Sequence, residues 1–251
     1  MALARTFHNS TRGGDTVTSI TSPSFTPTAN ALLIVVANHT IKTPADRTGD
    51  VTITNSAGLT FTKLTAKTWA PIGYTGNMNV WYCVVGGSPS SMTVTVAQAT
   101  VDTSYGSSID IFDYTGFDTG SPFGVTESFN RGTGYPNFTT GDGSWSVTLS
   151  TAPASTSEVV ACLLVDGVGS TTVSAGSGWT EIADPGSVEA QQIQVRSGST
   201  STNVAWVDTC DNAAGAYVNL AIVFEVKEAS GGGGGSAVPV FMQNYRRRRV
   251  Q

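Results

Sequence analysis

The sequence is poor in the residues on which most enzymes depend. Only 12% of its 251 residues are charged, and it contains two histidines and three cysteines. A catalytic triad needs a histidine within reach of a nucleophile and a carboxylate, and a structural zinc site needs a set of cysteine or histidine ligands. This composition disfavours both kinds of site. We therefore expect no enzyme activity, no metal and no cofactor.

Long hydrophobic runs are also missing. The longest run, Ala31–Ala37, has seven residues, whereas a membrane-spanning helix needs about 20. Residues 1–8 lack the apolar centre of a secretory signal, which favours a reducing compartment in which the cysteines stay unpaired. Cys83, Cys162 and Cys210 each lie in a strand-like apolar stretch, so we expect small buried side chains.

Neutral polar residues take the place of charge. The chain has 36 Thr, 27 Ser and 28 Gly, which are poor helix formers, and Thr suits pleated sheets. Short β-type runs recur between Gly, Pro, Asn and Asp, and no window shows sustained helical periodicity. The sequence therefore predicts an all-β fold of antiparallel strands. These are expected at 15–21, 31–38, 50–55, 59–65, 78–86, 92–97, 107–115, 144–149, 157–165, 189–196, 202–208 and 217–227.

A weak internal repeat runs through the chain in constant order. The matching pairs are 30–36 with 157–164, 58–60 with 178–180, 91–96 with 201–206, and 108–114 with 219–225. The pattern predicts two tandem β-sandwiches, immunoglobulin-like or jelly-roll-like; one larger sandwich from a duplicated half is the alternative. The expected divisions are an N-terminal arm with a first strand (1–25), sandwich 1 (26–120), sandwich 2 (121–229), a Gly-rich linker (230–236) and a tail (237–251).

The tail differs in charge from the rest of the chain. Residues 1–236 carry nine basic and all eighteen acidic residues, a net charge of −9, whereas the tail carries four arginines and no acid. Five apolar or aromatic residues precede the arginines, and a solvated tail would not need them. We therefore predict that the tail docks on a partner as an added strand. The docking residues are Val238, Val240, Phe241, Met242, Tyr245, Arg246, Arg247, Arg248 and Arg249.

Two partners suit the arginine tip, and a solvated tip is the third interpretation. An acidic protein surface would pair with the guanidinium groups, nucleic acid would give weak and salt-sensitive contacts, and the tip could also stay solvated. The acidic body disfavours nucleic acid, so a protein partner is the favoured interpretation.

Carboxylates offer little chemistry by spacing alone. Asp46 with Asp50, and Asp110 with Asp113 and Asp118, could supply calcium ligands, and Asp113, Asp118 and Glu127 could form a glycosidase pair. However, Asp110 alternates with isoleucines, which is typical of a solvent-facing strand position. We therefore interpret these acids as surface carboxylates.

Loop aromatics give a second, different hypothesis. Trp69, Tyr74 and Tyr135 lie in Gly- and Pro-rich stretches and could stack on sugar rings, or they could cap the ends of a sandwich. Trp81, Trp145 and Trp206 lie in strand patterns and are expected in the core. A tail-associated or fibre-type module that binds a glycan or receptor is the alternative function.

Several stretches resemble β-sandwich accessory proteins of tailed bacteriophage virions. They are Asn30–Val36, Val80–Val85, Ile109–Gly116 and the tail stretch Val238–Tyr245. The resemblance implies a structural virion protein of the capsid-decoration, head-fibre or tail-associated type, assembled in the host cytoplasm. It implies the major capsid protein or another virion subunit as partner, with homo-oligomers in the assembly, and supplies no catalytic residues.

Overall fold

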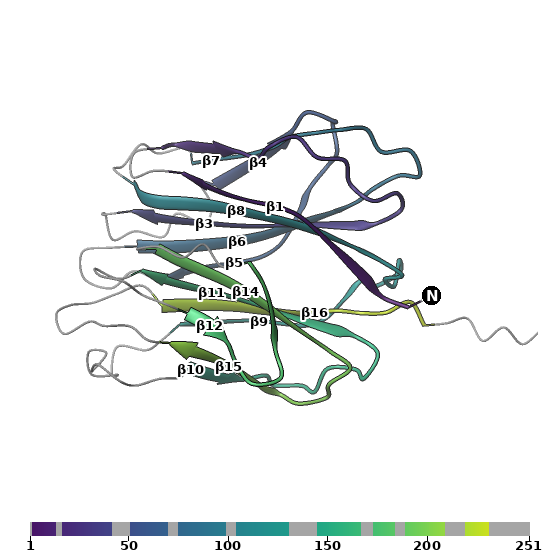
Figure 1. The fold of residues 1–251 in the computed structure, drawn as a ribbon, viewed down its shortest axis with the longest axis vertical. Coiled ribbons are helices and arrows are strands. Elements are labelled where there is room, and N and C mark those ends of the chain that lie inside the picture. Colours follow the sequence, from purple (N-terminus) through teal and green to yellow (C-terminus); the bar gives the residue numbers. More distant parts are fainter. Residues whose placement is uncertain are drawn as a thin grey trace, which may run out of the picture.

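The structure, a computed structural model, describes residues 2–13, 17–41, 51–69, 75–98, 104–130, 145–166, 173–183, 189–208 and 219–230. Sixteen strands form four antiparallel sheets (Figure 1). The described residues include no helix, and so none that could cross a bilayer. The predicted all-β class of antiparallel sandwiches is confirmed.

The first unit comprises eight strands in two sheets. The larger sheet has the order β1-β8-β3-β6-β5 and the smaller one β2-β7-β4. This is the strand order of a jelly roll, except that β5 pairs with β6 in the larger sheet. The strands are β1 (Ala4–Gly13), β2 (Ser19–Thr21), β3 (Leu32–Ile41), β4 (Val51–Asn55), β5 (Thr62–Trp69), β6 (Thr75–Val84), β7 (Val94–Gln98) and β8 (Ser104–Thr115).

The second unit repeats this topology. Its sheets have the orders β9-β16-β11-β14-β13 and β10-β15-β12, so each strand corresponds to the strand eight places earlier. The four repeat pairs found in the sequence fall on β3 and β11, on the turns before β5 and β13, on β7 and β15, and on β8 and β16. The strands are β9 (Phe123–Asn130), β10 (Trp145–Thr148), β11 (Glu158–Asp166), β12 (Val173–Ala175), β13 (Thr180–Ala183), β14 (Glu189–Ser197), β15 (Asn203–Asp208) and β16 (Asn219–Val226).

The same tight turn precedes β5 and β13. Gly58 and Gly178 have φ angles of +72° and +79°, a left-handed conformation that glycine adopts without steric cost. The conserved position of this turn in both halves supports duplication of one jelly-roll unit.

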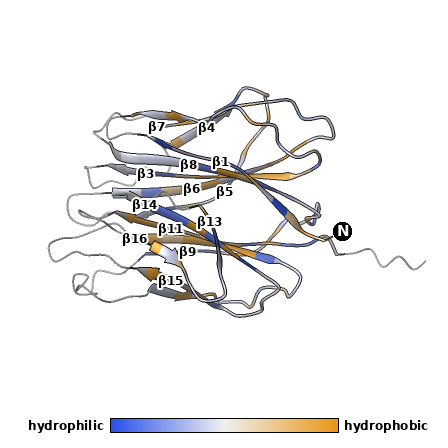
Figure 2. Ribbon diagram, in the orientation of Figure 1, coloured by the Kyte–Doolittle hydropathy of each residue, from blue (hydrophilic) through white to orange (hydrophobic). Residues whose placement is uncertain are grey.

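The two units stack through their five-stranded sheets, which gives four layers. The outer cores lie between the sheets of each unit, and a third core lies between the two large sheets. Leu32, Ile34 and Val36 of β3 face the central core, whereas the alternate residues Leu33 and Val35 face the outer core. Both faces of β3 and β11 are therefore buried, which explains why their sequences are continuously apolar (Figure 2).

Four strands lack a clear pattern in the sequence: β1, β9, β12 and β13. Strand β1 is an edge strand, and a β-bulge between Phe7 and Asn9 interrupts its alternation. Strand β9 is also an edge strand with an irregular register, and β12 and β13 have only three and four residues. Within residues 1–25, expected as an arm and first strand, the structure places Ala4–Gly13 in β1 and Ser19–Thr21 in β2 of the first unit.

The core positions of the tryptophans and cysteines follow the sequence expectation. Trp81 and Trp206 are buried, and the partly buried Trp145 stacks on Trp206 at a centroid distance of 5.2 Å. Cys83 and Cys162 are buried and free, while Cys210 lies outside the described residues. Burial raises the pKa of Cys83 to about 12, so this thiol stays protonated at neutral pH.

Candidate functional site between the two units

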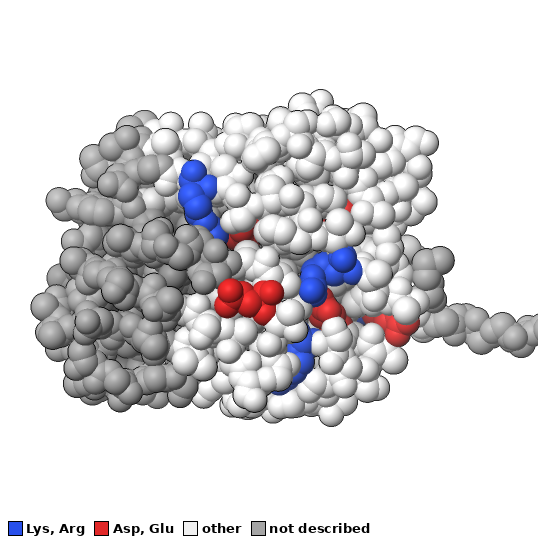
Figure 3. All heavy atoms as spheres, viewed as in Figure 1, with Lys and Arg blue, Asp and Glu red and all other residues white. Residues whose placement is uncertain are grey.

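Charged side chains on one face of the molecule lie in a band between the two units (Figure 3). Two groups of polar residues from both units flank the apolar central core. We call these residues the inter-unit polar cluster. Its members are Arg5, Arg12, Ser108, Asp110, Tyr114, Glu158, Gln191 and Ser197.

Glu158 is the centre of the first group. Its Oε1 accepts hydrogen bonds from the Arg5 guanidinium and from the Tyr114 hydroxyl, the latter at 2.6 Å, and its Oε2 accepts one from Ser197. Arg5 and Tyr114 belong to the first unit, whereas Glu158 and Ser197 belong to the second. Burial, and then the neighbouring Glu158, raises the pKa of Tyr114 well above its usual value, so Tyr114 remains a neutral donor. This group thus joins the two units.

Asp110 is the centre of the second group. Gln191 of the second unit donates to Asp110 Oδ2, Ser108 donates to Gln191, and Arg12 Nη2 lies 3.6 Å from Asp110 Oδ1. Burial has the largest effect on Asp110 and raises its pKa, while Arg12 and hydrogen bonds from Ser10 and Gln191 act in the opposite direction.

The interpretation of Asp110 as a surface carboxylate is wrong. Its side chain is 0% exposed. Alternation with Ile109 and Ile111 predicts a solvent-facing position only where one face of a sheet is open to water. Here the second unit covers that face, so the alternate position lies between two sheets.

A second pair of buried carboxylates occupies equivalent places in the two units. Asp113 pairs with Leu33 in the register of β8 and β3, and Glu225 pairs with Val159 in the register of β16 and β11. Asp113 is 0% exposed, so its interpretation as a surface carboxylate is also wrong.

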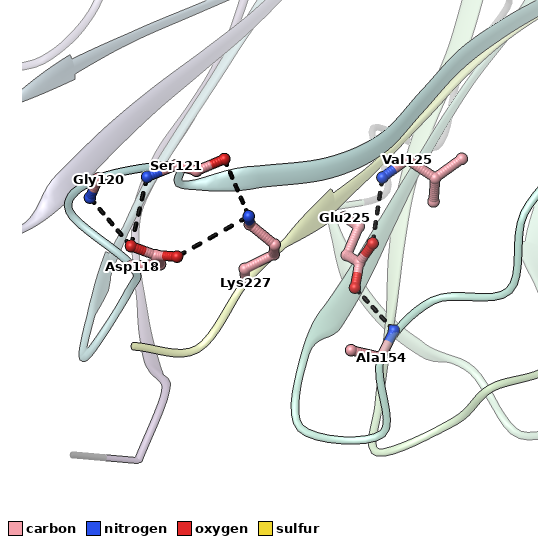
Figure 4. A network of polar contacts seen from close by, with 7 residues as sticks. All are labelled: Asp118, Gly120, Ser121, Val125, Ala154, Glu225 and Lys227. Atoms are coloured by element: carbon pink, nitrogen blue, oxygen red, sulfur yellow. Dashed lines mark hydrogen bonds and ion pairs between the residues drawn. The ribbon is translucent and has the colours of Figure 1, made fainter. Parts of the chain in front are cut away.

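Asp113 and Glu225 also make equivalent contacts. Asp113 Oδ2 accepts the Thr28 N–H at 2.7 Å and lies 2.7 Å from His8 Nε2. Glu225 accepts the Ala154 N–H at 2.8 Å and the Val125 N–H at 3.1 Å (Figure 4). Each carboxylate thereby ties an edge strand to the turn that precedes the central strand of its sheet.

Gly124 makes room for the Glu225 carboxylate. A Cβ atom on Gly124 would lie 1.9 Å from Glu225 Oε2, which is closer than any van der Waals contact allows. The glycine therefore lets β9 approach the acid closely enough for the Val125 N–H to bind it.

The other predicted acids lie elsewhere. Asp118 is 31% exposed and accepts the Gly120 and Ser121 N–H groups, and Glu127 accepts the Ser150 N–H at 2.8 Å. Asp46 and Asp50 fall outside the described residues. Within the described part of the chain, no three His, Cys, Asp or Glu residues are grouped so that they could hold a metal ion.

His39 is a buried neutral imidazole in the first unit. Burial lowers its pKa from 6.5 to about 4, and hydrogen bonds with Gln98 and Asn38 partly offset this effect. Asn38, Ser107 and Ile109 line a cavity of about 10 Å³ beside it, which is about the volume that one water molecule requires.

We predict that His39 makes the protein less stable as the pH falls from about 6.5 to about 4. In this range the unfolded chain takes up a proton on His39 and the folded chain does not, so the unfolded state binds more protons. The full effect is about 3 kcal/mol. Urea unfolding of the native protein and of His39→Gln across this range measures it. The variant should show a flatter pH dependence; equal slopes would contradict the assignment.

A hollow lies at the end of the first unit. Its volume is about 220 Å³, and Pro27, Leu59, Val85, Pro89 and Met92 are among its lining residues. No titratable side chain lines it. It can accept an apolar group by contact but offers no acid, base or nucleophile beyond serine hydroxyls.

The predicted binding residues are only partly described. Trp69 ends β5, is partly buried and packs against the central core, while Tyr74 and Tyr135 lie outside the described residues. The linker residues after Ser230 and all nine tail residues from Val238 to Arg249 named above also lie outside them. Their docking role stays a prediction.

The members of the inter-unit polar cluster were not found from the sequence. One signal for them exists in the repeat. The register makes Glu158 equivalent to Leu32, and Asp110 equivalent to Ile222. An acid in one half that replaces an aliphatic residue in the other marks a position where the two halves must differ because they contact each other.

Comparison with known proteins gives no relative. No family model, curated protein or solved structure matches the chain. The resemblance to phage accessory proteins therefore stays a prediction, and the function must be argued from the fold, the polar contacts and the sequence of the tail.

Proposed function

We propose that the chain is a non-enzymatic structural subunit of a virion, and that its C-terminal tail anchors it to a neighbouring subunit. The observation that carries the proposal is that the buried carboxylates named above all make structural contacts. Asp110 and Glu158 join the two units, and Asp113 and Glu225 fix strands to turns. Groups that could perform acid–base chemistry thus stabilise a rigid four-layered body.

The virion setting rests on analogy of fold and sequence. Jelly rolls build many viral capsid domains, although the same fold also occurs in lectins and cupins, so the fold alone does not decide the function. The resemblance of the strand stretches and tail to phage accessory proteins favours capsid decoration or another head-associated role. The partner would then be the major capsid protein or another virion subunit.

The segment between β16 and the linker is fixed to the rest of the body by hydrogen bonds, as an attachment point for a tail requires. The chain between the two units pairs with the chain after β16: Lys227 donates its N–H to Pro122 O and accepts the Asp118 N–H at its own carbonyl, both at 2.9 Å. The Lys227 side chain also contacts Ser121 and Asp118 (Figure 4). Lys227, which follows β16 of the second unit, is therefore hydrogen-bonded to the chain that connects the two units. The linker to the tail starts from this bonded segment.

We expect deletion of residues 231–251 to leave the body folded and to remove it from its particle. The reason is that every described core residue precedes Ser230, whereas the predicted anchor follows it. Particles purified from a host that makes the truncated chain should contain at least tenfold less of it than particles with the full chain. Thermal unfolding of the truncated chain should stay cooperative, with the midpoint that the full chain shows at concentrations where it is a monomer.

A matched control keeps the tail but changes the linker. Replacement of Gly231–Gly235 by five serines preserves length and flexibility, so this variant should enter particles at the normal level. Normal incorporation of the truncated chain would contradict the proposed anchor.

A further inference from the structure

The outer edge of β1 is open for pairing. Strand β1 is the first strand of its sheet, and its ten residues pair with β8 on one side only within the part of the chain that the structure describes. An edge strand presents unpaired N–H and C=O groups to any extended peptide that can reach them. Phe7 on this strand is 39% exposed, so the edge also offers an apolar contact.

The tail has the length and composition of a strand that would fit this edge. Residues 237–245 number nine, and they combine five apolar or aromatic side chains with Ala237, Pro239, Gln243 and Asn244. Pro239 cannot donate a hydrogen bond to the ladder, which an edge strand tolerates where that position faces solvent. β-Branched and aromatic side chains favour extended pairing, and main-chain hydrogen bonds supply the affinity of an added strand.

The last described residues before the linker lie near the start of β1. The Ala229 N–H donates to Gly116 O at 2.8 Å, and the adjacent Thr115 pairs with Ala4 at the start of β1. Figure 1 shows the first strand beginning at the same end of the molecule at which β16 ends. A chain that continues from Ala229 therefore starts close to the first residues of β1.

The length of the linker limits how a tail can pair with the β1 strand of its own chain. From Ser230 to Ala237 there are seven residue steps, which reach about 25 Å when fully extended. Strand β1 is about 30 Å long. A tail that returned antiparallel within one chain would have to start about 26 Å from Ala4, since residues 237–245 span eight strand steps, and this is the full reach of the linker. Antiparallel pairing within one chain would therefore need a completely stretched linker, whereas pairing with a second copy carries no such requirement.

Antiparallel pairing agrees better with the remaining structure. Every described strand pair in the protein is antiparallel, the pattern with the stronger hydrogen bonds. It would also place the four arginines of the tail near Ala4, at the end of β1 where Glu228 and Asp118 lie, rather than near Arg12. The negative net charge of residues 1–236 favours the same arrangement.

We infer that residues 237–245 of one copy add as an antiparallel strand to the outer edge of β1 in a second copy. The inference rests on the proposed function, because it names the neighbouring subunit that receives the tail. Two copies that exchange tails in this way form a closed twofold dimer with two identical contacts.

The molar mass in solution tests the exchange. Light scattering should show a dimer for the full chain that dissociates on dilution, and a monomer after deletion of residues 231–251. Phe7→Lys should also give a monomer, because a charge replaces the apolar contact. The matched control is Val84→Lys, since Val84 is an exposed apolar residue of β6, 55% exposed, and lies away from the edge; it should remain dimeric.

A mixed pair of cysteine variants tests the direction. In a Cys210→Ser background, one chain carries Thr6→Cys and the other carries either Gln243→Cys or Ala237→Cys. Antiparallel exchange predicts a disulfide-linked dimer of Thr6→Cys with Gln243→Cys and at least tenfold less with Ala237→Cys. The reverse result, or a dimer that survives both the tail deletion and Phe7→Lys, would overturn the inference.

The two proposals fail in different ways. If the full chain is a monomer at all concentrations but the tail is still required for incorporation into particles, the anchor stands and the β1 docking site is wrong. If the tail affects neither the molar mass nor incorporation, both proposals are wrong.

Discussion

Replacing Glu158 by alanine is expected to lower the free energy of unfolding by about 3 kcal/mol or more, because one partner of a buried ion pair is lost. The Arg5 and Glu158 side chains are 20% and 11% exposed, and Tyr114 is fully buried. Without the carboxylate, the Arg5 guanidinium and the Tyr114 hydroxyl both lose their acceptor at a site with little access to water. Urea unfolding of the full chain measures the change.

A double variant shows whether the loss of stability in Glu158→Ala comes from unpaired buried polar groups or from lost packing in the core. In the first unit the position equivalent to Glu158 is Leu32. The variant with Arg5→Met and Glu158→Leu replaces both charges by apolar groups and should recover most of the lost stability. If Glu158→Ala costs less than about 1 kcal/mol, the range of an exposed pair, the group does not join the units as we describe.

Replacing Asp113 or Glu225 by alanine should cost about 3 kcal/mol in each case, because two hydrogen bonds to a charged acceptor are removed. The Thr28 N–H and His8 lose their acceptor in the first unit, and the Ala154 and Val125 N–H groups lose theirs in the second. The costs should be similar, since the two acids hold equivalent turns. Urea unfolding of both variants tests this.

Asp118→Ala is the matched control for these two acids. Asp118 also accepts backbone N–H groups, from Gly120 and Ser121, but it is 31% exposed and water can replace it. Its loss should cost less than about 1 kcal/mol, as for an ordinary surface substitution. Equal costs for Asp113, Glu225 and Asp118 would show that the buried acids have no special role.

The fold class could be predicted because its signals are local. Thr-rich runs of strand length and the turn at Gly58 and Gly178 are properties of short stretches, and the repeat compares such stretches directly. Strand β1 was missed for the same reason: the bulge at Phe7 and Asn9 breaks the local period, and its place is fixed by pairing with β8, about a hundred residues away.

One feature of the sequence indicates that the two units stack on each other. The apolar run Ala31–Ala37 is too continuous for a strand with one wet face, so it indicated that a second layer covers the sheet. Asp110 on the neighbouring strand β8 suggests the opposite, namely that this face of the sheet is open to solvent. The two indications conflict, so the sequence alone does not predict the stacking. The burial of Asp110 follows from the second unit, which covers this face and supplies Gln191, 81 residues away, as a partner.

The inter-unit polar cluster depends on contacts that no spacing in the sequence contains. Arg5 and Glu158 are 153 residues apart and come from different units. Their meeting follows from how two copies of one fold pack on each other. A comparison of the two halves, position by position, would have marked Glu158 and Asp110 as departures from the repeat.

The protein combines a body of two packed units with a tail that we propose to dock as a strand. Buried acids hold the two jelly rolls and their turns, and the short chain from Phe117 to Pro122 fixes the root of the tail beside β1. A body of this kind suits a subunit whose role is to occupy a place in an assembly, and the tail supplies the connection.

Hydrogen exchange at the backbone amides of residues 4–13 tests the tail contact most directly. If the tail of a second copy pairs with β1, the amides of residues 4–13 that point away from β8, about every second one, should exchange slowly in the concentrated full chain, because those that point toward β8 are bonded in every sample. The amides that point away from β8 should exchange at least tenfold faster after dilution or after deletion of residues 231–251, while β3 stays protected in every sample. Equal exchange of residues 4–13 in all samples would contradict the central claim.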